Sequence, residues 1–197
     1  MKKRLVYGLL ALVLWTNAGY AFELDGKKSI GFARSIGGPA GLALGLGVGD
    51  SQFELIFGGH YLAPETDDVA VTLAVGTGLH FHLLRAEEAT FAVGLRLNTA
   101  TGSAVRIEQS STGLRTRART DNIVQWGLDI PLRVYWFPSK AFSIHTEWGI
   151  VFSTAPEEGL LFPSPDRNGF VLEPNGVRIG MFESAEGFGE IGMTFWW

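Results

Sequence analysis

Apolar and polar residues alternate one by one along most of this chain, which is the period of β-strands that present one apolar face. Between positions 69 and 83, the odd positions carry Val, Leu, Phe or Thr, and the even positions carry Ala, Gly, Thr or His. Segments with the same split follow one another along the chain. They predict eight strands, near 29–36, 40–49, 52–62, 69–85, 89–101, 122–137, 141–154 and 187–197.

The connections between these segments alternate in length. Short turns are predicted at 49–51, 86–88 and 138–140, whereas the other connections are 37–39, 63–68, 102–121 and 155–186. Short turns at one end and longer loops at the other are typical of a transmembrane barrel, which also needs an even number of strands. The pattern predicts an all-β fold, a closed antiparallel up-and-down barrel. A strand at 177–182 after a turn at 173–176 leaves a count of ten open.

A soluble β-sandwich is the alternative, because its strands alternate as well. Several segments here exceed ten residues, whereas soluble strands average about five or six. Trp126 and Trp136 lie ten residues apart on one apolar face, and so do Phe142 and Phe152. Ten residues in a strand tilted by about 45° span roughly 23 Å, close to the apolar band of about 25 Å between two aromatic girdles. The spacing therefore favours a membrane barrel.

The first residues predict export. Lys2, Lys3 and Arg4 precede an apolar run over 5–15, and Gly19 and Ala21 fit a cleavage site. We therefore expect a cleavable signal peptide at 1–21 and one barrel domain at 22–197. Three of the sixteen basic residues belong to that signal and none of the twenty acidic ones does, so the mature net charge is −7. This balance argues against nucleic acid as a partner, and the absence of cysteine excludes disulfides.

The end of the chain resembles the C-terminal signal by which outer-membrane barrels are recognised for insertion. Glu190, Gly192, Phe195 and Trp197 match its pattern of a polar residue, a glycine two positions later, and aromatic residues third from last and last. The mature chain is similar in architecture to the small eight-stranded class that includes the OmpA membrane domain and OmpX. That resemblance implies a monomer in the bacterial outer membrane, inserted by the barrel-assembly machinery.

Ionisable side chains fall on the face opposite the apolar one, which a barrel turns inward. An unpaired charge in such a lumen is costly, so we expect a buried ion-pair network. Counting from the turn at 138–140 places Arg133 opposite His145 and diagonal to Glu147. Polar side chains are ordinary in such a lumen, so we expect no metal or other cofactor despite the histidines. The expected lumen set is Glu54, His80, His82, Arg96, Asp129, Arg133, His145, Glu147 and Glu190.

Two further expectations concern function, and one concerns the backbone. No histidine falls on the lipid-facing side, so we expect no lipid-modifying enzyme. We expect a structural or surface-interaction role for the barrel. The alternative is a narrow solute channel lined by the small inward residues. Pro131 cannot donate to a ladder, which predicts a bulge.

The segment 102–121 keeps its alternation, so the fifth and sixth strands are expected to rise as one hairpin with a turn at 110–113. Its inward phase carries a set of arginines that would form a basic face for lipopolysaccharide phosphates or an acidic partner. The final loop is acidic, which leaves open that it pairs with them instead. The arginines are Arg106, Arg115, Arg117 and Arg119.

Overall fold

The computed structural model describes residues 23–62, 70–109, 115–156, 161, 176–181 and 190–197. The expected signal peptide lies outside the described residues. The described residues form nine strands, and their bounds are β1 (Lys28–Arg34), β2 (Ala40–Val48), β3 (Ser51–Leu62), β4 (Ala70–Arg85), β5 (Ala89–Gln109), β6 (Arg115–Ser139), β7 (Phe142–Ala155), β8 (Gly176–Met181) and β9 (Glu190–Trp196). They contain no helix long and apolar enough to cross a membrane.

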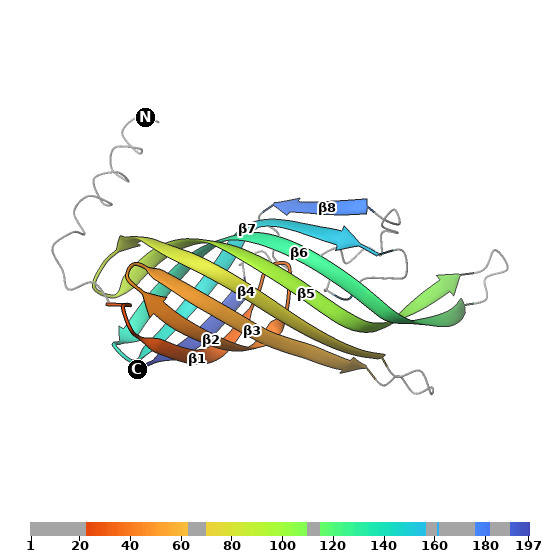
Figure 1. Ribbon diagram of the computed structural model, residues 1–197, viewed down its shortest axis with the longest axis horizontal. Coiled ribbons are helices and arrows are strands. Elements are labelled where there is room, and N and C mark those ends of the chain that lie inside the picture. The colour runs from red at the N-terminus through yellow and green to blue at the C-terminus, as the bar shows by residue number, and fades with distance from the viewer. Residues whose placement is uncertain (1–22, 63–69, 110–114, 157–160, 162–175, 182–189) are drawn as a thin grey trace, which may run out of the picture.

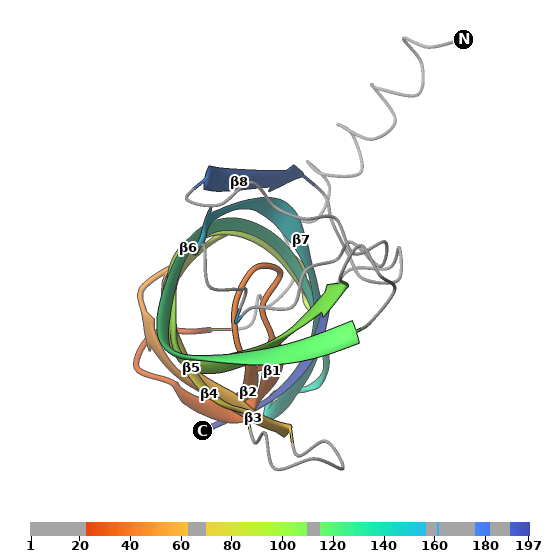
Figure 2. The same cartoon turned by 90° about the vertical axis from the view of Figure 1, so that its right-hand side faces the viewer.

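Eight of these strands close into a ring. Neighbours in the chain pair antiparallel from β1 to β7, β7 pairs with β9, and β9 pairs back with β1 (Figure 2). The strand β8 pairs with Ile150–Ala155 of β7, beyond the part of β7 that holds β9. The prediction of an all-β, closed antiparallel barrel of eight strands is confirmed. The extra strand β8 pairs with one end of β7 and is not part of the ring, so the ring does not have ten strands.

The strand registers fix the tilt of the barrel. One path of paired residues runs once around the ring through Trp126, Thr99, Val75, Phe57, Leu42, Phe32, Met193, Ile144 and Trp136. One circuit therefore advances ten residues along β6. Ten residues of about 3.3 Å against eight strand spacings of about 4.8 Å give a tilt of about 40° and a rise of about 25 Å. The two tryptophans thus mark the height of the wall.

The hairpin β5–β6 extends well past the rest of the barrel (Figure 1). Its arms pair from Ala89 with Trp136 to Gln109 with Arg115, which confirms the long hairpin expected from the sequence. The register shifts between Gly102 and Ala104, and Asn122 on the facing arm has a φ of 61°. This irregularity marks the change from the barrel wall to the projecting part. The expected turn at 110–113 lies outside the described residues.

The predicted bulge at Pro131 is wrong. Pro131 faces Gly149 on β7, and the pairs on both sides keep one register. Toward β5, the register is the same at Val93–Leu132 as at Arg96–Asp129. A Cβ on Gly149 would lie 2.1 Å from the carbonyl oxygen of Ile130, so glycine opposite the proline admits a close approach of the two backbones. The strand therefore accepts proline without an inserted residue.

Candidate functional site

Two arginines and two glutamates, contributed by four strands, form the centre of the lumen. Arg96 on β5 holds both carboxylate oxygens of Glu147 on β7, with Nη1 to Oε1 at 2.7 Å and Nη2 to Oε2 at 2.6 Å. Arg133 on β6 holds both oxygens of Glu54 on β3, with Nη1 to Oε1 at 2.7 Å and Nη2 to Oε2 at 3.0 Å. All four side chains are buried. Forked pairs of this kind are the strongest form of ion pair, and they set the relative position of their strands.

Polar neighbours surround this centre. Asn98 donates its side-chain amide to Asp129 at 2.7 Å, and Arg96 Nη1 lies 3.4 Å from the same carboxylate oxygen. Tyr135 accepts a hydrogen bond from Arg133 and donates to Gln52 at 2.8 Å. His80 Nε2 lies 3.2 Å from Glu54. The centre is thus continued by hydrogen bonds toward both ends of the lumen. Asn98, Gln52 and Tyr135 share the inward phase, but only ionisable residues were expected as members.

The register corrects one expected contact. Arg133 lies directly opposite Glu147, and Tyr135 lies opposite His145. The expectation that Arg133 faces His145 is wrong because the hairpin turns at Lys140 and Ala141, after Ser139 pairs with Phe142 and a register shift follows toward Trp136. Counting from a turn at 138–140 therefore misplaces the partner by two residues.

Three members of the expected lumen set lie apart from this ion-pair centre. The rings of His82 and His145 pack on the Tyr135 ring, with centroids 5.2 and 5.0 Å away. Neither ring has a hydrogen-bond partner within the described part of the chain. Glu190 instead pairs with Arg34 at 3.2 Å, and its side chain is 12 % exposed. No cluster of three His, Asp or Glu side chains among the described residues is arranged to hold a metal ion.

The connection between β1 and β2 folds into the barrel, where Figure 2 shows it as an orange loop inside the ring. Ser35 anchors it with two hydrogen bonds: the Ser35 backbone N–H and hydroxyl both donate to the Pro39 carbonyl, at 3.0 and 2.9 Å. The N–H of Ile36 donates to Glu147 at 3.2 Å. A Cβ on Gly37 would lie 2.5 Å from Asp129, and one on Gly38 would lie 2.3 Å from Asn98. The loop is therefore seated on the charged centre like a plug.

This plug also explains the end of the first strand. The alternation predicted a strand over 29–36, but β1 ends at Arg34 and the next residues turn inward. Two adjacent glycines permit the close contacts with Asp129 and Asn98 that a side chain would block. The pattern of apolar positions carries no signal for this inward turn.

Apolar residues close the lumen on either side of the polar centre. Near the chain ends, the buried cluster is Leu24, Ala92, Tyr135, Phe137 and Trp196. Toward the other end it is Ala74, Ala100, Ile123 and Leu161. The N–H of Leu161, which belongs to the connection after β7, donates to the side chain of Gln125 at 2.7 Å. The lumen is thus filled at three levels by described residues.

Several of the small inward residues are packed closely against other described residues. A Cβ on Gly47 would meet the Leu24 carbonyl oxygen at 1.8 Å, and one on Gly94 would meet His80 at 2.6 Å. A Cβ on Gly76 would meet the side chains of Asn98, Arg96 and Pro39. Among the described residues, these glycines make room for larger side chains and for the plug.

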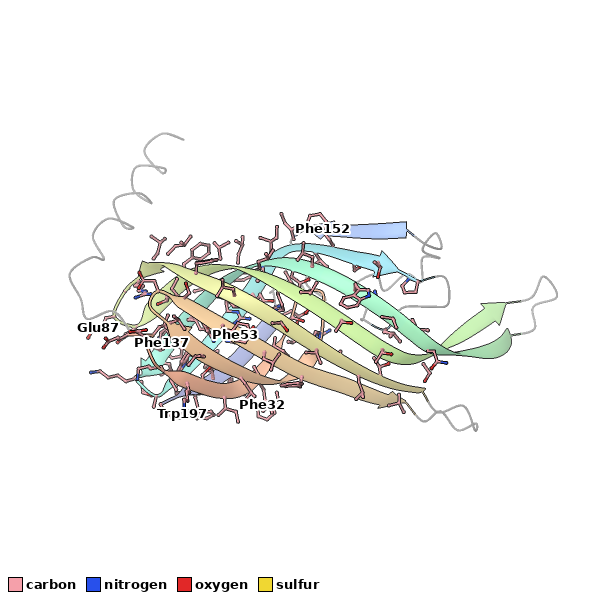
Figure 3. The ribbon with its side chains drawn as sticks, viewed as in Figure 1. Phe32, Phe53, Glu87, Phe137, Phe152 and Trp197 are labelled. Carbon is pink, nitrogen blue, oxygen red and sulfur yellow. The ribbon has the colours of Figure 1, made fainter. Side chains whose placement is uncertain are left out.

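The outer surface is apolar. Phe32, Phe152 and Trp197 point away from the barrel in Figure 3. Trp126 and Trp136, which bound the path described above, are both 50 % exposed. Further exposed apolar side chains come from β2, β3, β4, β5 and β9 and are Leu42, Leu44, Leu46, Phe53, Phe57, Leu73, Leu79, Phe81, Leu95, Leu97, Ile191, Met193 and Phe195. A ring of this kind surrounds the barrel.

The register of the projecting hairpin separates position 106 from the other three arginine positions. Arg117 pairs with Ile107, whereas Arg106 pairs with Ala118. Paired residues share a face and successive residues alternate, so position 106 lies opposite positions 115, 117 and 119. The expectation of one shared face is therefore wrong for Arg106. The register shift near Gly102 is the reason, because it changes the phase of one arm against the other.

The residues that resemble an insertion signal lie on the last strand, β9, and directly after it. Phe195 and Trp197 are exposed on the outer surface. Gly192 lies under the His145 ring, where a Cβ would come within 2.2 Å. Glycine at this position therefore has a packing role, independent of any role in recognition.

Comparisons with known proteins give one structural likeness and no match in sequence. No family model matches the chain, and no curated protein matches it. Among solved structures, the chain is similar to the N-terminal β-barrel domain of OprF from Pseudomonas aeruginosa, with 12 % identity and a TM-score of 0.42, over 88 % of this chain and 98 % of that one. The strand pairings themselves define the closed eight-stranded barrel.

Proposed function

We propose that the chain is an outer-membrane barrel protein whose solid barrel holds surface segments in the outer membrane. The observation that carries this proposal is the ring of exposed apolar side chains around a closed barrel, with its ionisable residues inside. The rise of about 25 Å between the tryptophan levels equals the apolar band of outer-membrane barrels. In water, an exposed apolar surface of this extent would promote association.

The proposal is a structural or surface-interaction role rather than transport. The plug, the ion-pair centre and the two apolar clusters occupy the lumen at successive levels. An interior of eight strands is just wide enough for side chains. We therefore expect the purified protein, folded in a planar bilayer, to show no single-channel conductance. Steady conductance from the native chain would replace this role with the channel alternative.

For the surface role, the proposed contacts are made by the hairpin and the final connection, with lipopolysaccharide phosphates or an acidic partner. The support is three arginines that alternate along one arm, Arg115, Arg117 and Arg119, on a hairpin that extends past the barrel. Such contacts weaken with added salt because they are electrostatic. Export by a cleavable signal, insertion by the barrel-assembly machinery and a monomeric state complete the proposal.

The test compares two triple variants. Arg115, Arg117 and Arg119 changed to Ala should lose most salt-sensitive binding to lipopolysaccharide, measured by sedimentation with labelled lipid. The matched control changes Lys27, Lys28 and Lys140 to Ala, which removes three charges at the other end of the barrel. Equal binding by the two variants would contradict the surface contact while leaving the membrane barrel in place.

A further inference from the structure

One side of the barrel wall is low. The strands β1 and β2 have 7 and 9 residues, whereas β5 and β6 have 21 and 25. Above β1 the chain turns into the lumen as the plug, and β8 pairs only with β7 among the described residues. No described strand therefore continues the wall above the end of β1. This low side lies at the end of the barrel that carries the long hairpin (Figure 1).

The depth of Arg34 follows from the paired path. The path reaches Phe32 after five strand-to-strand steps down from Trp126. Each step lowers the path by about 3 Å, which is an eighth of the rise of about 25 Å. Arg34 lies two residues further up β1, which regains about 5 Å. Its Cα is thus about 11 Å below the level of Trp126, near the middle of the apolar ring.

Arg34 faces outward at that depth. Its side chain is 45 % exposed, and Phe32, the preceding outward residue, is 64 % exposed. The Nε of Arg34 contacts Glu190 at 3.2 Å, but the glutamate side chain is only 12 % exposed. The pair therefore presents its positive end to the surroundings. An outward arginine at the bilayer midplane costs about 2–4 kcal/mol, whereas near the interface it costs about 0–1 kcal/mol.

We propose that the phosphate of an outer-leaflet lipid headgroup descends into this low side of the wall and binds the Arg34 guanidinium. A phosphate matches the fork of the guanidinium, and the Arg34 side chain is 45 % exposed beside its glutamate contact. Local thinning of a bilayer is one way in which membranes accommodate a charged side chain at depth. The exposed Phe32 and Leu42 lie below Arg34 as a surface for the acyl chains. This inference rests on the proposed membrane location.

The absence of cysteine allows a direct measurement of depth. Ala40 pairs with Arg34 across β1 and β2 and is exposed, so Ala40→Cys places one fluorophore beside the arginine. Leu97→Cys gives a matched site, because its Cα lies at nearly the same depth on β5 and its side chain is exposed. Each labelled chain is folded in phosphatidylglycerol-containing vesicles with a spin label on the lipid headgroup, or with one at the middle of the acyl chain.

We expect the headgroup label to quench position 40 about twofold more than position 97, because the headgroups descend only at the low side. The quantity compared is the ratio of quenching by the headgroup label to quenching by the acyl-chain label. Adding Arg34→Leu should lower this ratio at position 40 to its value at position 97. Adding inorganic phosphate should leave the ratio unchanged, since the proposed ligand is a lipid headgroup.

Equal quenching at the two positions in the native background would overturn the proposal. So would a high ratio at position 40 that survives Arg34→Leu, because the headgroups would then descend without the guanidinium. A ratio lowered by inorganic phosphate would assign the site to the free anion. Failure of both spin labels to quench either position would instead contradict the membrane location itself.

Discussion

Arg133 and Glu147 face each other across the β6–β7 ladder. One carboxylate oxygen of Glu147 accepts hydrogen bonds from both Nε and Nη2 of the arginine, at 2.9 and 2.5 Å. The same guanidinium also holds Glu54 on β3, from across the lumen. A single side chain thus joins two acidic residues that are far apart in the sequence. Because both glutamates are buried, its removal leaves charge without compensation at the centre of the barrel.

Arg133→Met should therefore destabilise the barrel by about 3–5 kcal/mol, the usual cost of breaking a buried ion pair from one side. The measurement is the free energy of unfolding from urea titration in lipid vesicles, followed by tryptophan fluorescence. Arg85→Met is the control, since Arg85 pairs with a largely exposed Asp50 near a turn and should change stability by less than about 1 kcal/mol. Equal losses in the two variants would show that the buried pairing does not stabilise the fold.

Packing of the plug predicts a different sensitivity. Gly76→Val should destabilise the protein by about 1–3 kcal/mol, since extra volume in a filled core forces its neighbours to shift. A Cβ at position 76 would lie 2.7 Å from Asn98 and 3.3 Å from the Pro39 ring. Ala40→Val, on the exposed side of the same region, is the control and should be nearly neutral. Calorimetric or urea unfolding of both variants decides the matter, and a neutral Gly76→Val would mean that the loop is not seated in the lumen.

The irregularity in the long hairpin can be tested at Asn122, whose φ is 61°. Residues with a Cβ other than Asn and Asp lose about 1–2 kcal/mol in this left-handed conformation, whereas glycine adopts it readily. Asn122→Ala should therefore lower the free energy of unfolding by about 1 kcal/mol, and Asn122→Gly should leave it within a few tenths. A loss of the same size in both variants would point to the asparagine side chain rather than the backbone.

The alternation along the chain predicts the wall of this barrel well, because a strand in a closed sheet has only two faces and one of them is apolar here. Inward positions such as Arg96 and Glu147 follow from phase alone. Their pairing does not, because the turn at Lys140 and Ala141 displaces the partner of Arg133 by three residues, and the register shift near Trp136 then moves it back by one. The plug escapes prediction for another reason. Its position depends on hydrogen bonds to Glu147 and close contacts with Asn98, which are distant in the sequence.

At the end of the apolar ring, the side chain of Thr154 takes the place of a backbone partner in the β6–β7 ladder. The Trp126 backbone N–H donates to Thr154 Oγ1 at 2.9 Å, and the same hydroxyl donates to the Trp126 carbonyl at 3.2 Å. At the proposed membrane location these groups lie at the border of the apolar band, where few waters can satisfy them, and the hydroxyl does so instead.

Thr154→Val keeps the shape of the side chain and removes both hydrogen bonds. We expect a loss of about 1–3 kcal/mol in the free energy of unfolding, the cost of leaving buried polar groups without partners. Thr77→Val is the matched control, because Thr77 also faces outward on β4, pairs regularly with Leu97, and its change to valine should be neutral or slightly stabilising in lipid. The contrast should disappear in a water-exposed setting, since water would then satisfy the Trp126 groups. Equal stability of the two variants in vesicles would therefore place the upper end of β7 in water rather than in the bilayer.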